Sequence, residues 1–332
     1  MIAFGVEQKQ NYDFLRLTGS LAVIMIHLCA KVINNYQTFP HGAVVAAVVL
    51  SALSRWAVPL FIMVSGAIFL GGEYTWVRKR VFYKKRLGKI FWPFVFWNLI
   101  YWLVFGGSWR EGLQSLWRYS QAYYHLYYLA VAMGLYAITP ILRKLNLKIT
   151  TVVGMAGATI YTAGYYLGWW QKVEYLPVIF VPYLGLYCLG GWLAKVGAKT
   201  GWIWVVVALG LLMAGVTMKT LYQYGATDGG QVAFDRLWPW VGLQAVAVFL
   251  VFKNYGFGKG GGLVNKLAEL SLGVYLIHPL ITDKLFFQPV SFNGWAYVVF
   301  WIISRLLLAV LLAGGLTWLM KRLAITRGLV GG

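Results

Sequence analysis

Ten apolar runs, most about 20 residues long, constrain this chain more than any other feature. About 20 apolar residues cross the ~30 Å hydrocarbon core of a bilayer as a helix. Inside that core every backbone N–H and C=O must be bonded within the protein, so helices are the expected form. The runs cover residues 12–34, 43–70, 87–105, 124–142, 150–169, 176–194, 201–221, 234–252, 268–287 and 295–320. We therefore predict an all-α integral membrane protein with about ten transmembrane helices, forming one polytopic domain over residues 1–332.

Composition and charge agree with this class and orient it. The chain is 60% hydrophobic and only 11% charged, whereas a soluble domain is about 25% charged. Basic residues gather in alternate loops, above all in the second loop, and at the C-terminus, while the N-terminus has only Lys9. Cytoplasmic loops carry such an excess. We expect both termini in the cytoplasm. The net charge of +20 then reflects topology and contact with membrane lipids, and no nucleic-acid partner is expected.

The cysteines and the N-terminal run indicate no disulfide, metal site or cleavable signal sequence. Cys29 and Cys188 both lie in apolar runs, so neither a disulfide framework nor a metal site is indicated. The first apolar run lacks a small-residue cleavage site and keeps its polar residues, so we expect no cleavable signal sequence. Between residues 106 and 123 the chain is too polar to cross, and either a short interfacial helix or an aromatic loop is expected there.

The first run carries ionisable side chains in a helical pattern. Arg16 and His27 are eleven residues apart, within about 20° of three full helical turns, so they share one face about 16 Å apart along the axis. Asp13 lies three residues before Arg16, where it can pair with the guanidinium. With Ser20 they form a polar stripe. Placing an ionisable residue inside a membrane has a high free-energy cost, so such residues are functional candidates by default.

Each of these residues also has a structural interpretation. Asp13 could cap the helix, and Arg16 could extend its charge to the lipid headgroups. His27 could be a core histidine bonded by a neighbouring helix. The phase shared by His27 and Arg16 favours a functional role for the histidine.

Two candidates lie in the second run. Arg55 falls near the predicted midplane with no acidic residue near it in sequence, so we expect it to face a water-filled or ligand-filled cavity. Ser65, beside Gly66, either lines a cofactor site or belongs to ordinary close helix packing. Pro59 between them removes a backbone hydrogen bond and predicts a kink.

The loop between the second and third runs is the strongest basic cluster. Its Lys and Arg residues are Arg78, Lys79, Arg80, Lys84, Lys85, Arg86 and Lys89. Such a cluster marks the cytoplasmic face and binds anionic headgroups. It could also bind a phosphorylated cytosolic donor, for which Arg80 and Arg86 are the candidates.

Later candidates lie at the predicted outer side. His125 opens the fourth run among tyrosines, as a site residue or as part of an aromatic belt. Tyr275 and His278 lie in the ninth run, where His278 precedes Pro279 and either lines a site or bonds a neighbouring helix. Trp238 in the seventh loop could stack on a sugar, although interfacial tryptophans are common.

Four stretches, in order, resemble membrane acyltransferase family three, whose members are bacterial inner-membrane proteins that O-acylate cell-surface sugars. They are Asp-x-x-Arg with a His eleven residues after the Arg, Arg before Val-Pro-Leu-Phe with a terminal Ser-Gly, His-Leu-aromatic-aromatic, and Ser-x-Gly-x-Tyr-x-x-His. Together they cover most of the chain. Among the members of this family, the chain resembles the small stand-alone ones that act on enterobacterial common antigen and similar polysaccharides.

The resemblance implies an O-acyltransferase, with acetyl-CoA or another cytosolic acyl-CoA as donor and a surface or lipid-linked glycan as acceptor. On this expectation Arg16, held by Asp13, and the basic loop bind coenzyme A. His27 acts as general base or as a transient acyl carrier. Arg55 stabilises the oxyanion or the pantetheine carbonyls.

Two other classes stay open. A secondary transporter or flippase also has intramembrane charges and broken helices, although no internal repeat is evident. A membrane sensor or scaffold would need no chemistry from His27. The acyl chain, the acceptor sugar and the oligomeric state are not determined by the sequence.

Overall fold

The computed structural model describes residues 2–3, 6–74, 79–106, 110, 123–169, 180–196, 200–220, 239–255, 261–285 and 294–331. Its contacts group into two compact units, each built from separated segments. Unit 1 comprises Met1–Val6, Ile62–Gly197 and Thr317–Gly332, and unit 2 comprises Glu7–Phe61 and Ala198–Leu316. We describe each unit by itself.

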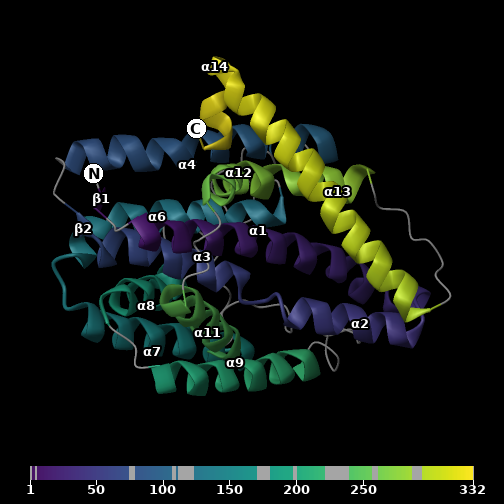
Figure 1. Ribbon diagram of the computed structural model, residues 1–332, viewed down its shortest axis with the longest axis horizontal. Helices are drawn as coiled ribbons and strands as arrows, with labels where there is room; N and C mark the ends of the chain where they lie inside the picture. Colours follow the sequence, from purple (N-terminus) through teal and green to yellow (C-terminus); the bar gives the residue numbers. More distant parts are fainter. Residues whose placement is uncertain are drawn as a thin grey trace. The chain divides into compact units, whose positions relative to one another are not determined.

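Helices lie in every one of the ten predicted apolar runs (Figure 1). They are α1 (Val6–Asn34), α2 (His41–Ala52), α3 (Ala57–Gly66), α4 (Lys79–Phe105), α6 (Tyr127–Leu142), α7 (Leu147–Tyr166), α8 (Leu184–Lys195), α9 (Thr200–Thr220), α11 (Pro239–Tyr255), α12 (Gly261–Pro279), α13 (Trp295–Arg322) and α14 (Ala324–Arg327). In the described residues the strands are β1 (Ile2–Ala3) and β2 (Glu73–Tyr74), which pair antiparallel. The predicted all-α class is confirmed.

Five helical stretches of the described residues are long and apolar enough to cross a membrane. They are Gln10–Asn34, His41–Gly71, Arg86–Phe105, Tyr124–Leu142 and Trp295–Arg322, with a shorter apolar helix over Ile203–Val216. The protein therefore has the character of a membrane protein. Ten spans and cytoplasmic termini stay predictions, and the expected interfacial helix falls mostly outside the described residues.

The second predicted span is not one continuous helix. Residues 53–56 form turns between α2 and α3, so Arg55 lies in a break rather than within a helix. Pro59 is the third residue of α3, and proline is tolerated in a first turn because the N–H there has no intrahelical partner. Helical backbone then continues past α3 as a π-helical segment, Ala67–Gly71.

The third helix begins earlier than the apolar pattern predicts. We expected a loop up to residue 86, but α4 starts at Lys79. Lys and Arg are good helix formers, so a basic sequence ahead of an apolar run extends the helix. Arg80 and Arg86 consequently lie on α4, at its N-terminal end.

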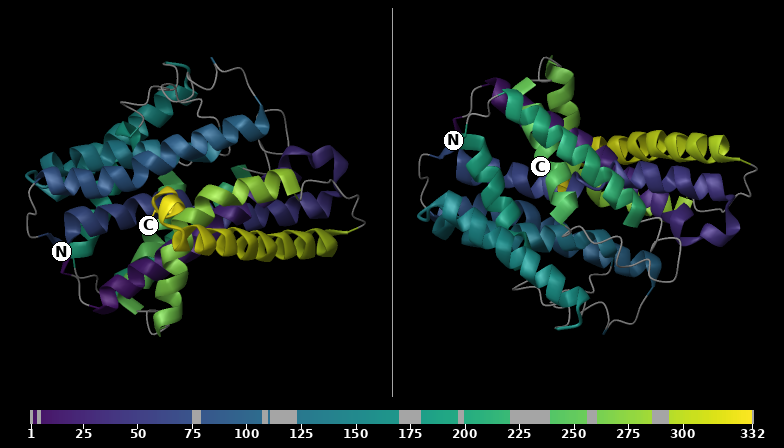
Figure 2. Two further views of the ribbon diagram at one scale, coloured as in Figure 1. Left: turned by 90° about the horizontal axis from the view of Figure 1, so that it is seen from above. Right: turned by 90° about the horizontal axis from the view of Figure 1, so that it is seen from below.

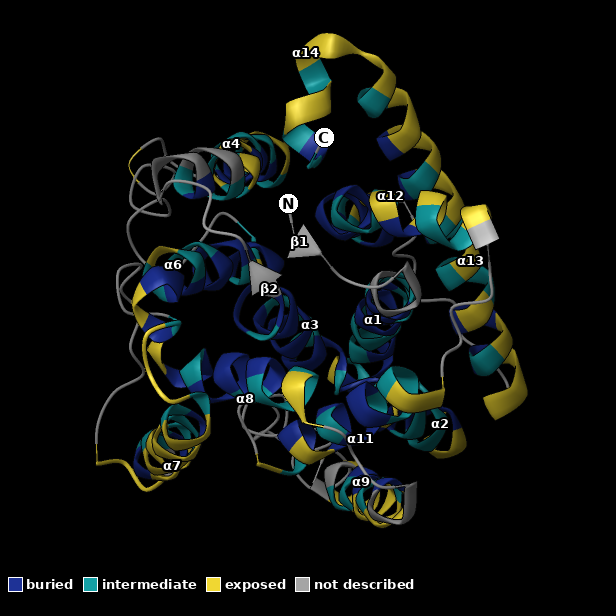
Figure 3. Ribbon diagram, turned by 60° about the vertical axis from the view of Figure 1, so that its left-hand side comes forward, coloured by how far each residue is buried: buried dark blue, intermediate teal, exposed yellow. Residues whose placement is uncertain are grey.

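Unit 1 is held together by close approach of helix backbones at glycine. A Cβ on Gly190 of α8 would overlap the backbone of Met63 in α3, and one on Gly185 of α8 would overlap Gly154 in α7. Membrane helices use small residues in this way because packing, rather than a hydrophobic driving force, holds them together. In Figure 3, α3 is mostly dark blue, and α8 is buried mainly over the stretch that holds its glycines, 185–191, as expected for such packing.

Unit 2 is built around aromatic contacts of α1. Phe14 stacks on Phe252 of α11 at 5.3 Å between ring centroids, and Tyr12 stacks on Phe249 at 6.3 Å. Helices α9 and α11 lie side by side (Figure 1).

The last long helix presents a broad apolar surface. Helix α13 is long and unbroken in both views of Figure 2. It exposes Phe300 (71%) and Leu311 (70%), the exposure expected of a face that contacts lipid.

Candidate functional site

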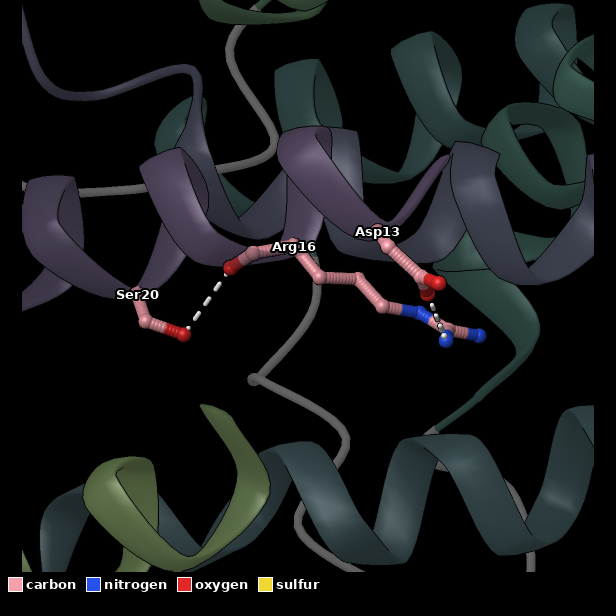
Figure 4. Close-up of polar contacts among 3 residues, drawn as sticks. All are labelled: Asp13, Arg16 and Ser20. Atoms are coloured by element: carbon pink, nitrogen blue, oxygen red, sulfur yellow. Dashed lines mark hydrogen bonds and ion pairs between the residues drawn. The ribbon is translucent and has the colours of Figure 1, made fainter. Parts of the chain in front are cut away.

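The N-terminal part of α1 carries the predicted ion pair. Arg16 Nη1 donates to Asp13 Oδ1 at 3.2 Å, as the three-residue spacing predicts. Ser20 Oγ donates to the backbone carbonyl of Arg16 at 2.9 Å (Figure 4). The hydroxyl of Ser20 is therefore bonded to the helix itself. The side chain of Arg16 is 38% exposed, so its guanidinium is accessible while Asp13 orients it.

The C-terminal half of α1 brings His27 against His278 of α12. Their ring centroids are 5.3 Å apart and the ring planes differ by 23°, a stacked geometry within the range of aromatic pairs. His278 is fully buried and His27 is half-buried. The sequence left open whether His278 lines a site or bonds a neighbouring helix. Unit 2 places it beside the predicted catalytic histidine.

The backbone around Pro279 fixes the orientation of His278. In an α-helix the N–H of residue 279 would bond the carbonyl of Tyr275, but proline has no N–H. His278 Nδ1 lies 2.8 Å from that carbonyl oxygen and 3.3 Å from that of Val274. Carbonyl oxygens only accept, so Nδ1 carries a hydrogen, and in the neutral ring Nε2 is the basic nitrogen. The His-Pro pair thus selects a tautomer.

For the acyl transfer that the sequence resemblance implies, replacing Pro279 with Ala is expected to lower turnover without unfolding the protein. The new N–H at position 279 competes for the Tyr275 carbonyl and weakens the hydrogen bond that holds His278. One such bond is worth about 1 kcal/mol, which corresponds to about a fivefold lower kcat. Turnover of labelled acetyl-CoA by protein in nanodiscs measures this, and Pro140→Ala in α6, also a proline inside a helix, is the matched control. An unchanged kcat would contradict the role given to Pro279.

Two further predicted residues lie in unit 2. Arg55 is 7% exposed and belongs to the same unit as His27. Tyr275 is 5% exposed, and its ring centroid lies 5.9 Å from that of His278.

The remaining described candidates lie in unit 1. Tyr136 Oη donates to Ser65 Oγ at 3.4 Å, and the Arg86 guanidinium lies 5.1 Å from the ring centroid of Phe69. His125 is 1% exposed and packs edge-on against Tyr101, with the ring centroids 4.9 Å apart. Its role in positioning an acceptor stays a prediction. Trp238 and the side chain of Arg80 fall outside the described residues.

One residue pair beside the histidines was not predicted from the sequence. Lys31 and Asp283 form an ion pair of 2.6 Å in unit 2, although both were expected only at the ends of predicted spans. The available signal was the four-residue spacing from His27 to Lys31, which puts both side chains on one face of α1.

Comparisons with known proteins bear on this site. The chain matches the sequence model of a family described as an acyltransferase domain over residues 9–314. An amino-acid racemase of Enterococcus faecalis is 24% identical over 313 residues, an alignment that covers 82% of this chain. The chain spans only 41% of that relative's length. No solved structure matches the chain.

The family match contains the Asp13–Arg16 pair, the two histidines and Arg55 within its limits. It agrees with the resemblance carried by the four sequence stretches. The chain belongs to the membrane acyltransferase family three.

Proposed function

We propose that the protein is an integral membrane O-acyltransferase that moves an acyl group, in the first instance acetyl, from cytosolic acyl-CoA to a hydroxyl of a surface or lipid-linked glycan. Membership of the family supports the reaction class. The observation that carries the proposal is the stacked pair of His27 and His278. His27 lies on the same helix, α1, as an accessible Arg16 that is held by Asp13.

His27 is the general base of the proposed reaction. It takes the proton from the acceptor hydroxyl as the hydroxyl oxygen attacks the thioester carbonyl carbon. A C–O bond forms and the C–S bond breaks, and the proton passes from His27 to the departing thiolate sulfur. His278 stacks on His27 with its Nδ1 hydrogen directed to the backbone, so the imidazole face that His27 meets has a fixed orientation.

Arginines supply the other two proposed functions. Arg16 binds the phosphates of coenzyme A, because guanidinium groups form strong charge-assisted hydrogen bonds to phosphate. Arg80 and Arg86 are proposed to bind the same phosphates. Arg55 stabilises the oxyanion of the tetrahedral intermediate, a task for a buried positive charge in a site of low dielectric constant.

The cellular setting follows from the same proposal. Acyl-CoA is cytosolic and the acceptor glycan is presented at the periplasmic face, so the enzyme works in the bacterial inner membrane. The helices of membrane-spanning length and apolar composition support this location. Membrane lipids are its other partners.

The variant Arg16→Gln is expected to bind acetyl-CoA about tenfold more weakly, since charge-assisted hydrogen bonds contribute about 1.5–3 kcal/mol. Its kcat should fall less than its affinity, because the base is untouched. Equilibrium binding of labelled acetyl-CoA to protein in nanodiscs measures the change. Arg327→Gln, at an exposed arginine of α14, should bind as the wild type does. Equal losses in both variants would argue against a specific role for Arg16.

The proposed function is tested by acetyl-CoA labelled in the acetyl group, added to purified protein in nanodiscs. We expect saturable binding together with release of labelled acetate or transfer to added glycan. No binding of any acyl-CoA by folded protein would overturn the proposal. The break between α2 and α3 with a buried Arg55 is also typical of transport pathways, so substrate uptake would then be measured.

A further inference from the structure

An ion pair lies one helical turn beyond the stacked histidines. Lys31 Nζ is 2.6 Å from Asp283 Oδ1, and the two side chains are only 18% and 8% exposed. Thr282, itself 1% exposed, donates its hydroxyl to the same carboxylate oxygen at 3.0 Å. The carboxylate is thus held from two sides in a mostly buried position.

The histidine stack and the ion pair connect the same two parts of the chain, α1 and the stretch formed by α12 and the segment after it. On α1, Lys31 follows His27 by four residues and lies on the same face. On the other side of the contact, Asp283 follows His278 of α12 by five residues. In an α-helix position i+5 is turned about 140° away from position i, so an unbroken helix would direct Asp283 away from α1.

A change from α-helical to π-helical backbone lets Asp283 face α1 as His278 does. Directly after Pro279 the backbone becomes π-helical over Leu280–Leu285, where the hydrogen bonds run from i to i+5 and the turn is wider. This wider turn brings Asp283 to the side on which His278 lies, and Lys31 meets it there. Such π segments occur frequently at functional sites. In this chain the segment connects the ion pair to the histidine.

We propose that Lys31 and Asp283 are positioning residues of the two-histidine site, which hold the π-helical segment, and through it His278, against His27 during acyl transfer. The inference rests on the proposed function. Neither residue touches the acyl group. Their effect is to keep two imidazoles that belong to different helices at a fixed separation, because misplacement of reacting groups by about 1 Å can cost 10²-fold in rate.

Kinetics of the full chain in nanodiscs test the proposal, with labelled acetyl-CoA as the probe. Lys31→Met and Asp283→Asn should each lower kcat about tenfold, the lower end of what outer partners of a site contribute, with an unchanged KM for acetyl-CoA. The double variant should lose no more than either single one, because both remove one interaction. Lys31→Arg should restore most of the activity. Lys266→Met, at an exposed lysine of α12, is the control and should match the wild type.

A second measurement does not depend on activity. In a chain with Cys29 and Cys188 replaced by Ser, His27→Cys and His278→Cys are introduced together and oxidative cross-linking is followed. The rate should fall about fivefold or more when Lys31→Met is added, because proximity and orientation set it. If the wild type neither binds nor turns over acyl-CoA, the proposed function fails while this measurement still reports on the positioning.

The outcomes that would overturn the proposal are distinct. An unchanged cross-linking rate in the Lys31→Met protein does so, and so does a wild-type kcat in both single variants. Should the single variants fail to fold, Lys31→Asp combined with Asp283→Lys decides instead. A folded charge-swapped protein that keeps most of the wild-type kcat supports the ion pair, and a folded charge-swapped protein that has lost its activity contradicts it.

Discussion

The His27→Ala protein is expected to lose acyl transfer almost completely while it still inserts and folds. A positioned general base contributes roughly 10²- to 10⁴-fold to the rate, and the alanine variant keeps every other group of unit 2. Because His27 is half-buried and its side chain stacks rather than fills a core position, its removal should cost little stability. The measurement is kcat with labelled acetyl-CoA in nanodiscs, alongside thermal unfolding of the same samples.

The matched control is His41→Ala. His41 is the exposed first residue of α2, and its replacement should leave kcat unchanged. Normal transfer by His27→Ala would refute the mechanism. Quenching of the wild type with denaturant at neutral pH during turnover adds a second distinction. Acetyl label bound covalently to the protein, and missing in His27→Ala, would identify His27 as an acyl carrier rather than a base.

The second large effect is expected from Gly190→Ala, which should destabilise unit 1 strongly. A Cβ at this position would overlap the carbonyl group and Cα of Met63 in α3. Those atoms are backbone, so no side-chain rotation relieves the clash and the two helices must separate. Overpacking of this kind costs about 1–3 kcal/mol or more. Thermal unfolding in detergent measures the change, and we expect a clearly lower Tm and poor recovery of folded protein.

Gly157→Ala is the control for this substitution. Gly157 lies within α7 of the same unit, and a Cβ there would meet nothing within 4 Å. Alanine in a helix interior is more favourable than glycine by about 0.5–1 kcal/mol, so this variant should unfold at the same or a slightly higher temperature. A similar Tm for the two variants would show that the approach of α3 and α8 is not close at Gly190.

Local features of the fold were predictable because they depend on neighbouring residues. The apolar runs determine the helices, since a long apolar stretch has no other way to bond its backbone in a membrane. The Asp13–Arg16 pair follows from a spacing of three residues. The apolar run predicted over residues 87–105 matches the stretch Arg86–Phe105 that is long and apolar enough to cross a membrane. Helix α4 itself begins earlier, at Lys79, because the basic residues ahead of the run also favour a helix.

The family could be identified from the sequence for a related reason. The resemblance rests on short stretches in a fixed order, and the match over residues 9–314 confirms it. The roles of Arg16, Arg55, Arg86 and His125 stay predictions.

The sequence by itself therefore determined the helical class, the polar stripe of α1 and the family. Only the tertiary structure decided that His278 stacks on His27 and that Asp283 meets Lys31. These residues are far apart in the chain, and their pairing depends on how α1 and α12 pack. The α-helical rotation of about 100° per residue also does not predict which side chains share a face after Pro279. The backbone there is π-helical, and its turn is wider than an α-helical one.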